Sequence, residues 1–164
     1  MQIVDTHKSI LILDDEFDIV SVLKQGIDKR GFRVFPFTDL YLALKHFQIN
    51  FELYGLVISD LRMPGMNGYE FIEKVKGINP QVKVFFMTAF SINDIEFRRV
   101  LPFVKIDEFI EKPASLNKLV SLIDRYINLE IKNRRVVSQL DSMCNISAWE
   151  YSSPPLFNNM SSLK

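Results

Sequence analysis

The sequence predicts an α/β protein in which a five-stranded parallel sheet is covered by helices on both faces. Five short apolar runs recur along the 164-residue chain, and an amphipathic stretch of helical length follows each of them. Three of these runs are continuously apolar, as expected for strands that are buried on both faces. Because strand and helix alternate, the connections should be right-handed crossovers that leave the strands parallel.

The five predicted strands differ in how continuously apolar they are. They are SILIL (9–13), FRVF (32–35), LVIS (56–59), VKVFFM (82–87) and KIDEFI (105–110). The first, third and fourth are the continuous runs, which suits strands buried in the sheet. The fifth alternates between apolar and polar residues, which is typical of an edge strand with one solvated face.

The first helix is predicted from apolar residues that recur three and four positions apart. Its apolar face contains Phe17, Val20, Leu23 and Ile27. Gly31 follows this helix where a C-terminal cap is expected, because glycine adopts the left-handed conformation of such caps without steric cost.

The remaining helices show the same spacing with different boundary signals. The second follows Asp39, which is predicted to be its N-cap, and the third follows Asn67 and is expected to stop at Gly77. The fourth covers residues 92–101 and is shorter and less regular. The fifth opens at Ser115 and has a clear apolar face.

Residues 1–128 are predicted to form this α/β domain, followed by a segment over 129–144 and a tail over 145–164. The segment contains no Gly or Pro and has near-heptad apolar spacing, so it either continues the last helix or folds back on the domain. The tail is rich in Ser and Asn and contains a Pro-Pro pair, which predicts a flexible or loosely docked strap. The chain is too short for an added DNA-binding or catalytic output domain, so a stand-alone domain is expected.

The composition predicts a cytoplasmic protein that binds neither nucleic acid nor membranes. Lys and Arg together number 20, as do Asp and Glu, so no net charge attracts the chain to a polyanion. No apolar run approaches the roughly 18 residues that a membrane-spanning helix needs. A single cysteine, Cys144, excludes an intramolecular disulfide and suits a reducing compartment.

Polar residues follow four of the five strands. Asp14 and Asp15 follow the first strand, Asp60 the third, Thr88 the fourth and Lys112 the fifth. All strands of a parallel sheet end at one edge, and in a flavodoxin-like order 2-1-3-4-5 the first and third strands are neighbours. The three carboxylates should therefore converge at this edge of the sheet.

Such an acidic cluster predicts a metal-assisted phosphoryl-transfer site. Two carboxylates about 4 Å apart repel each other by about 4 kcal/mol at an effective dielectric constant near 20. A hard divalent cation relieves this repulsion, and oxygen ligands favour Mg²⁺ over zinc or copper. With Lys112 and Thr88 nearby, the set is suited to stabilise a transferring phosphoryl group, with Asp60 as its covalent acceptor.

Four segments carry a resemblance to a known family. They are ILILDDEFD, VISDLRMPGMNGYEFI, VFFMTAF and FIEKP, which together extend over roughly residues 8–128. In order and spacing they resemble the motifs of the response-regulator receiver domain of two-component signalling, and the chain looks like a stand-alone chemotaxis-type receiver with a C-terminal extension. The resemblance implies that Asp60 accepts a phosphoryl group from a phosphohistidine on a partner. It also implies that Asp14, Asp15, Asp60 and the backbone carbonyl of Arg62 bind Mg²⁺.

The resemblance further implies a conformational switch. Thr88 and Lys112 would bind phosphoryl oxygens, and the Lys112–Pro113 peptide bond is expected to be cis. Phe109 occupies the aromatic switch position, where it would rotate inward after Thr88 moves towards the phosphoryl group. Ala89 is small, as access to the site requires.

Phe90 stands two residues past Thr88, a position that the resemblance places beside the path a hydrolytic water would take. Its apolar side chain cannot orient water, which predicts slow autodephosphorylation. The chain would then catalyse its own phosphorylation and its slow reversal without being a conventional enzyme.

The partners that this resemblance implies are a sensor histidine kinase or phosphotransfer protein and a downstream protein of unknown identity. A homodimer through residues 92–101, 105–110 and the helix from 115, or through the C-terminal helix, is a further interpretation. Two alternatives stay open. One is a phosphatase of the haloacid-dehalogenase type, although Arg62 stands where that class has a second aspartate. The other is an interaction module that works without phosphorylation.

Overall fold

The computed structural model describes residues 9–63, 66–89, 105–128 and 136–137. The chain divides into two compact units, Met1–Asn128 and Leu129–Lys164. Of the second unit, residues 136–137 are described; they are helical and their side chains are exposed. The rest of the predicted helix continuation and tail, the helix expected over 92–101, and Phe90 lie outside the described residues.

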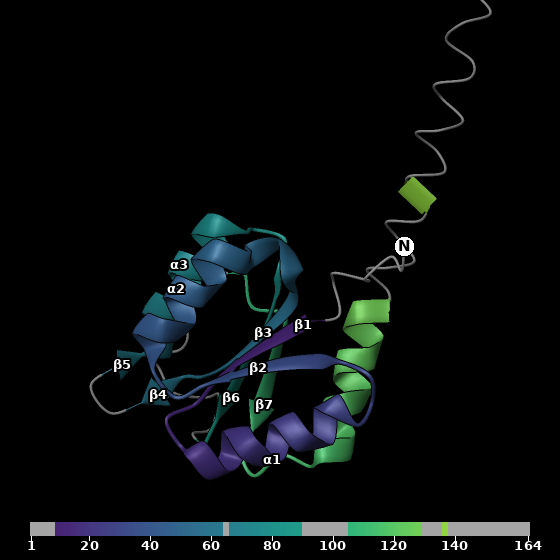
Figure 1. The fold of residues 1–164 in the computed structure, drawn as a ribbon. Coiled ribbons are helices and arrows are strands. Elements are labelled where there is room, and N and C mark those ends of the chain that lie inside the picture. The colour runs from purple at the N-terminus through teal and green to yellow at the C-terminus, as the bar shows by residue number, and fades with distance from the viewer. Residues whose placement is uncertain (1–8, 64–65, 90–104, 129–135, 138–164) are drawn as a thin grey trace, which may run out of the picture. The chain divides into compact units, whose positions relative to one another are not determined.

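The central feature of the first unit is a five-stranded parallel sheet (Figure 1). Its strands are β1 (Ser9–Leu13), β2 (Arg33–Phe37), β3 (Tyr54–Asp60), β6 (Lys83–Thr88) and β7 (Glu108–Glu111). They are ordered β2-β1-β3-β6-β7, which confirms the predicted flavodoxin-like order. All residues of β1 are buried, and so are all those of β3 except Gly55, because both strands are covered on both faces.

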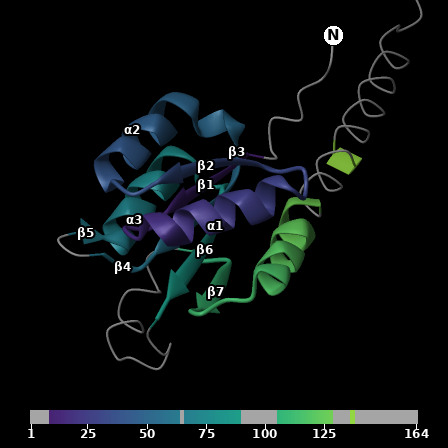
Figure 2. The same ribbon diagram turned by 60° about the horizontal axis from the view of Figure 1, so that its bottom comes forward.

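Helices cover both faces of the sheet, as predicted. They are α1 (Phe17–Asp28), α2 (Leu40–Asn50), α3 (Gly68–Ile78) and the helix over residues 116–128. Figures 1 and 2 show α2 and α3 on one face, with α1 and the helix over 116–128 on the other. A core cluster that includes Leu11, Val57 and Phe71 fills the layer beneath α2 and α3. No helix within the described ranges is both long and apolar enough to cross a bilayer.

The helix boundaries agree with the short-range signals at two N-termini. Asp39 Oδ1 accepts a hydrogen bond from Leu42 N at 2.8 Å, and Asn67 Oδ1 accepts one from Tyr69 N at 3.0 Å. Each side chain satisfies a backbone donor that the helix itself leaves unpaired. The predicted stop of the third helix at Gly77 is wrong, because α3 continues to Ile78.

The prediction that Phe17 belongs to the buried face of the first helix is also wrong. Phe17 is 73% exposed, whereas Val20, Leu23 and Ile27 are buried. Phe17 is the first residue of α1, and the buried face of the helix begins one turn later, at Val20. The C-cap of α1 is Lys29, and Gly31 lies two residues later in the turn that follows, with a φ of 87°, a conformation that favours glycine.

Two features of the chain course were not predicted. A short antiparallel hairpin, β4 (Arg62–Met63) with β5 (Met66–Asn67), follows β3 directly. A 3₁₀ turn, η2 (Phe51–Leu53), comes directly before β3. The edge strand β2 contains a proline, Pro36, opposite Ile12 of β1. The hairpin matters most for the site because it returns the chain to Asp60: Gly68 N donates to Leu61 O at 3.1 Å.

Candidate functional site

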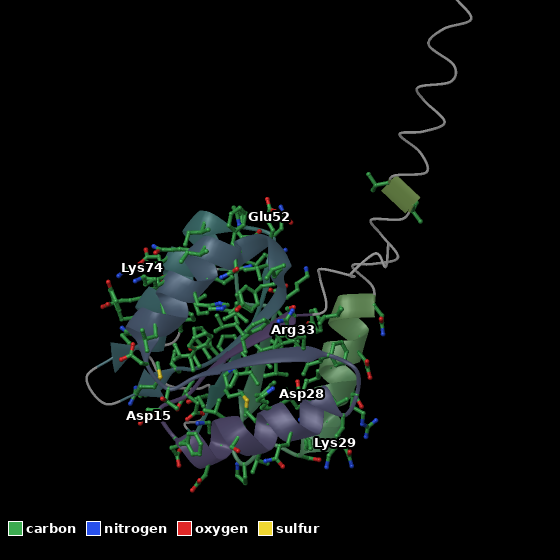
Figure 3. All side chains as sticks on the ribbon, in the orientation of Figure 1. Asp15, Asp28, Lys29, Arg33, Glu52 and Lys74 are labelled. Atoms are coloured by element: carbon green, nitrogen blue, oxygen red, sulfur yellow. The ribbon has the colours of Figure 1, made fainter. Side chains whose placement is uncertain are left out.

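The carboxyl edge of the sheet brings three aspartates together. Asp14 directly follows β1 and Asp60 ends β3; both are almost fully buried, at 2% and 8% exposure, whereas Asp15 is exposed. Each offers a carboxylate oxygen within 4.8 Å of the other two. Figure 3 shows Asp15 at the end of the sheet from which α1 starts, opposite the end that carries Arg33. The predicted convergence of the acidic residues therefore occurs.

Lys112 lies between the two buried carboxylates. Its Nζ donates to Asp14 Oδ2 at 2.7 Å and to Asp60 Oδ2 at 2.9 Å. Burial alone would lower the pKa of Lys112, but its hydrogen bonds and attraction to Asp14 and Asp60 outweigh burial and raise the pKa. The backbone N of Lys112 donates to Thr88 O at 2.8 Å, and the Lys112–Pro113 peptide bond is cis.

The remaining contacts hold the two buried carboxylates in place from the backbone. Glu16 N donates to Asp14 Oδ1 at 3.0 Å, and Asp14 N donates to Phe37 O at 3.1 Å. Arg62 N lies 3.4 Å from Asp60 Oδ1, a long hydrogen bond from the start of β4. Lys112 pairs with Asp14 and Asp60, and Asp15 lies beside them, so these four side chains have two negative charges more than positive when all are ionised.

This donor set fits a hard divalent cation. All three side chains present oxygen, and their spacing allows one ion to contact all of them. A cation would offset the excess negative charge that Lys112 alone leaves. Nitrogen or sulfur ligands, which zinc and copper prefer, are missing from this group of three aspartates.

A family model, the response regulator receiver domain, matches residues 10–124 of the chain. The chain belongs to this family. The receiver is the phosphorylation-switched part of two-component response regulators, and the family interacts with histidine kinases or phosphotransfer proteins.

Curated relatives differ in how much of their length the receiver covers. Sporulation initiation phosphotransferase F of Bacillus subtilis (strain 168) is 27% identical over 124 residues, which is 76% of this chain and 97% of that protein. The C4-dicarboxylate transport transcriptional regulatory protein DctD of Rhizobium meliloti (strain 1021) is 29% identical over 112 residues. That match covers 68% of this chain but 24% of DctD, so the chain spans about a quarter of that relative.

Solved structures agree with the fold. The receiver resembles the crystal structure of a CheY-like response regulator receiver domain protein from Methanospirillum hungatei JF-1, with a TM-score of 0.70 and 25% identity. The superposition covers 77% of this chain and 98% of that one.

The other residues predicted for the receiver site lie on β6 and β7 or just beyond them. Thr88 is buried at the end of β6, next to Met87, the residue that pairs with Asp60. Ala89 follows it and is exposed. Phe109 is half-buried on β7, and its ring stacks on that of Phe86, with centroids 5.9 Å apart and an interplanar angle of 29°.

Sequence reasoning missed two residues beside Asp60. Ser59 Oγ is buried and donates to Asp60 O at 2.8 Å. Gly68 packs so closely on the same carbonyl that an added Cβ would overlap its oxygen. No local sequence signal distinguishes Gly68 from an ordinary loop glycine or Ser59 from an ordinary buried strand residue.

A second charged cluster lies at the amino ends of β6 and β7 and was not predicted. The Asp107 carboxylate accepts from Val84 N at 2.9 Å and lies 3.8 Å from Lys76 Nζ and 3.5 Å from Lys83 Nζ. Lys76 Nζ also donates to Val82 O at 2.6 Å. Burial lowers the pKa of Lys76, although Asp107 acts in the opposite direction.

Proposed function

We propose that Asp60 accepts a phosphoryl group from a phosphohistidine of a sensor histidine kinase or phosphotransfer protein. The supporting observation is that the Asp60 carboxylate is bonded to Lys112 and lies close to the carboxylates of Asp14 and Asp15. Mg²⁺ would be held by Asp14, Asp15, Asp60 and the backbone carbonyl of Arg62. This cation would neutralise charge on the phosphoryl oxygens during transfer.

The chain's own groups have distinct roles in the proposed transfer. A carboxylate oxygen of Asp60 attacks phosphorus, the phosphorus–nitrogen bond to the donor imidazole breaks, and the imidazole leaves with that bond's electron pair. Lys112, already bonded to the Asp60 carboxylate, supplies a positive charge beside the phosphoryl oxygens. Thr88 supplies a neutral hydroxyl donor from the end of β6.

The proposed output is a change of surface that another protein recognises. Thr88 would move towards the phosphoryl group and Phe109 would turn into the space it leaves, which shifts the population between two states. The half-buried position of Phe109 supports this role, because the ring has both a packed and an exposed part. Slow autodephosphorylation and a homodimer through the face that includes β7 stay predictions, since Phe90 and residues 92–101 lie outside the described residues.

Intact-mass measurement after incubation with acetyl phosphate and Mg²⁺ tests the proposed acceptor. Wild type should gain the mass of one phosphoryl group, and Asp60→Asn should gain none, because an amide is a poor nucleophile. Asp124→Asn, a half-buried carboxylate of the helix over 116–128, is the matched control and should behave as wild type.

Two results would contradict the proposal. One is a phosphoryl group that still appears on Asp60→Asn. The other is steady turnover of a generic phosphomonoester by wild type, which would favour the phosphatase alternative despite Arg62.

A further inference from the structure

The peptide group between Asp60 and Leu61 is fixed from two sides. Ser59 Oγ donates to the Asp60 carbonyl oxygen at 2.8 Å, and Ser59 is fully buried at 0% exposure. From the other side Gly68 Cα packs against the same oxygen, so closely that no Cβ fits between them. The orientation of this peptide is therefore set by one hydroxyl and by one missing side chain.

This peptide controls more than the acceptor side chain. The residue after Leu61 is Arg62, whose N donates to Asp60 Oδ1 and whose carbonyl is the proposed backbone ligand of the cation. Gly68 N closes the intervening loop by donating to Leu61 O at 3.1 Å. Any rotation of the Asp60–Leu61 peptide would thus move the carboxylate and the Arg62 carbonyl relative to Lys112.

Burying the hydroxyl of Ser59 would destabilise the fold if it made no hydrogen bond. It stands at the end of a run of buried apolar residues, and burying a hydroxyl without a partner is unfavourable. No buried side-chain polar atom of the described residues lacks a partner, and the hydrogen bond described for Ser59 is the one to Asp60 O. An aliphatic residue would fill the strand position without needing any hydrogen bond.

We propose that Ser59 is a positioning residue for phosphoryl transfer. Through its hydrogen bond to Asp60 O it holds the backbone that presents the acceptor carboxylate and the Arg62 carbonyl to Mg²⁺ and the phosphoryl group. This role rests on the proposed function of Asp60, since it acts through that residue.

The test measures the Mg²⁺ dissociation constant by calorimetry, together with the initial rate of phosphorylation by acetyl phosphate. Ser59→Ala should weaken Mg²⁺ binding about fivefold, the effect of losing one ordinary hydrogen bond, and should slow phosphorylation to a similar extent. Ser59→Thr keeps the hydroxyl and should restore both values. Ser9→Ala is the matched control, because Ser9 is a buried serine at the opposite end of the neighbouring strand β1, and it should change neither.

The outcomes separate positioning from simple stabilisation. A merely structural role would lower the free energy of unfolding of Ser59→Ala but leave the Mg²⁺ affinity of the folded protein unchanged, and that result overturns the inference. If Ser59→Ala does not fold, Ser59→Cys, a weaker donor of similar size, takes its place. An intermediate affinity then supports the inference and a wild-type affinity overturns it. Wild type that gains no phosphate would contradict the proposed function instead.

Discussion

The two ends of the parallel sheet carry charged clusters of opposite balance. At the carboxyl edge three aspartates lie together and two of them pair with Lys112, whereas at the amino edge one aspartate, Asp107, lies near two lysines. Both contain a carboxylate whose side chain is at least 90% buried and both link strands to each other. Ion pairing and burial alone therefore do not distinguish a functional cluster from a structural one.

The difference lies in the sign of the excess charge that each cluster carries. At the amino edge Lys76 also donates to the Val82 carbonyl, and Asp107 accepts from Val84 N, so backbone dipoles satisfy these side chains. At the carboxyl edge the excess is negative, and Asp15 is exposed. Backbone N–H groups also donate to Asp14 and Asp60, so bonding to the backbone does not separate the two clusters. The sign of the excess charge does, because a negative excess favours a bound cation and a positive excess does not.

The largest expected effect comes from comparing two glycines of α3, Gly68 at its start and Gly77 near its end. Gly68→Ala should reduce phosphorylation at least about tenfold and lower the free energy of unfolding by about 2 kcal/mol, because the new Cβ displaces the Asp60 backbone. Gly77→Ala, in the same helix with no heavy atom within 4 Å of the added Cβ, is the control. It should stabilise the protein by about 0.5–1 kcal/mol and leave phosphorylation unchanged. Urea unfolding measures the stability of each variant, and intact mass measures its phosphorylation. If Gly68→Ala and Gly77→Ala are phosphorylated equally, Gly68 does not position the Asp60 backbone.

The next effect contrasts one acid from each cluster. Asp107→Asn should lower the free energy of unfolding by about 2 kcal/mol, because Lys76 and Lys83 lose their counter-charge in a largely buried site. Its Mg²⁺ affinity should stay that of wild type. Asp15→Asn should instead slightly stabilise the cation-free protein by relieving carboxylate repulsion, and should weaken Mg²⁺ binding. Urea titrations with a chelator and calorimetry measure these values, and the same sign of stability change in both variants would remove the distinction.

The smallest effect is a pH dependence at the amino edge. The pKa of Lys76 is lowered in the folded protein, so between that value and the ordinary lysine pKa near 10.5 the unfolded chain binds more protons. Stability due to this group should rise with pH across that window. Lys76→Met should remove this rise. Urea unfolding of wild type and variant at several pH values between neutral and about 10.5 would show it as a difference in their free energies of unfolding that grows with pH. If the difference in free energy of unfolding does not change with pH, the pKa of Lys76 is not lowered by folding.

Much of the fold was predictable because its signals are local or periodic. Alternating apolar runs and amphipathic stretches indicated the parallel sheet, and Asp39 was correctly predicted as a cap because a cap acts within one helical turn. Gly77 did not end its helix because Lys76 binds Val82 O and Ile78 packs against the core on either side of it. Tertiary contacts there outweigh the weak helix propensity of one glycine.

The acidic cluster was predictable because parallel strands place all their carboxyl ends at one edge. Ser59 and Asp107 were not, since their partners are a carbonyl and two lysines that only the folded backbone brings near. Asp107 was read as part of an alternating edge strand, and the register that aligns it with Val84 is not encoded in any short segment. Contacts of this kind depend on the exact orientation of peptide groups.

Pro36, in the edge strand β2, affects how the sheet can associate with other molecules. Proline has no amide hydrogen to donate, and in a sheet its nitrogen is tolerated where it faces outward from a border strand. The β2 border is therefore a poor template for an added strand from another molecule. Association that extends the hydrogen-bonded ladder is therefore disfavoured on that side of the sheet.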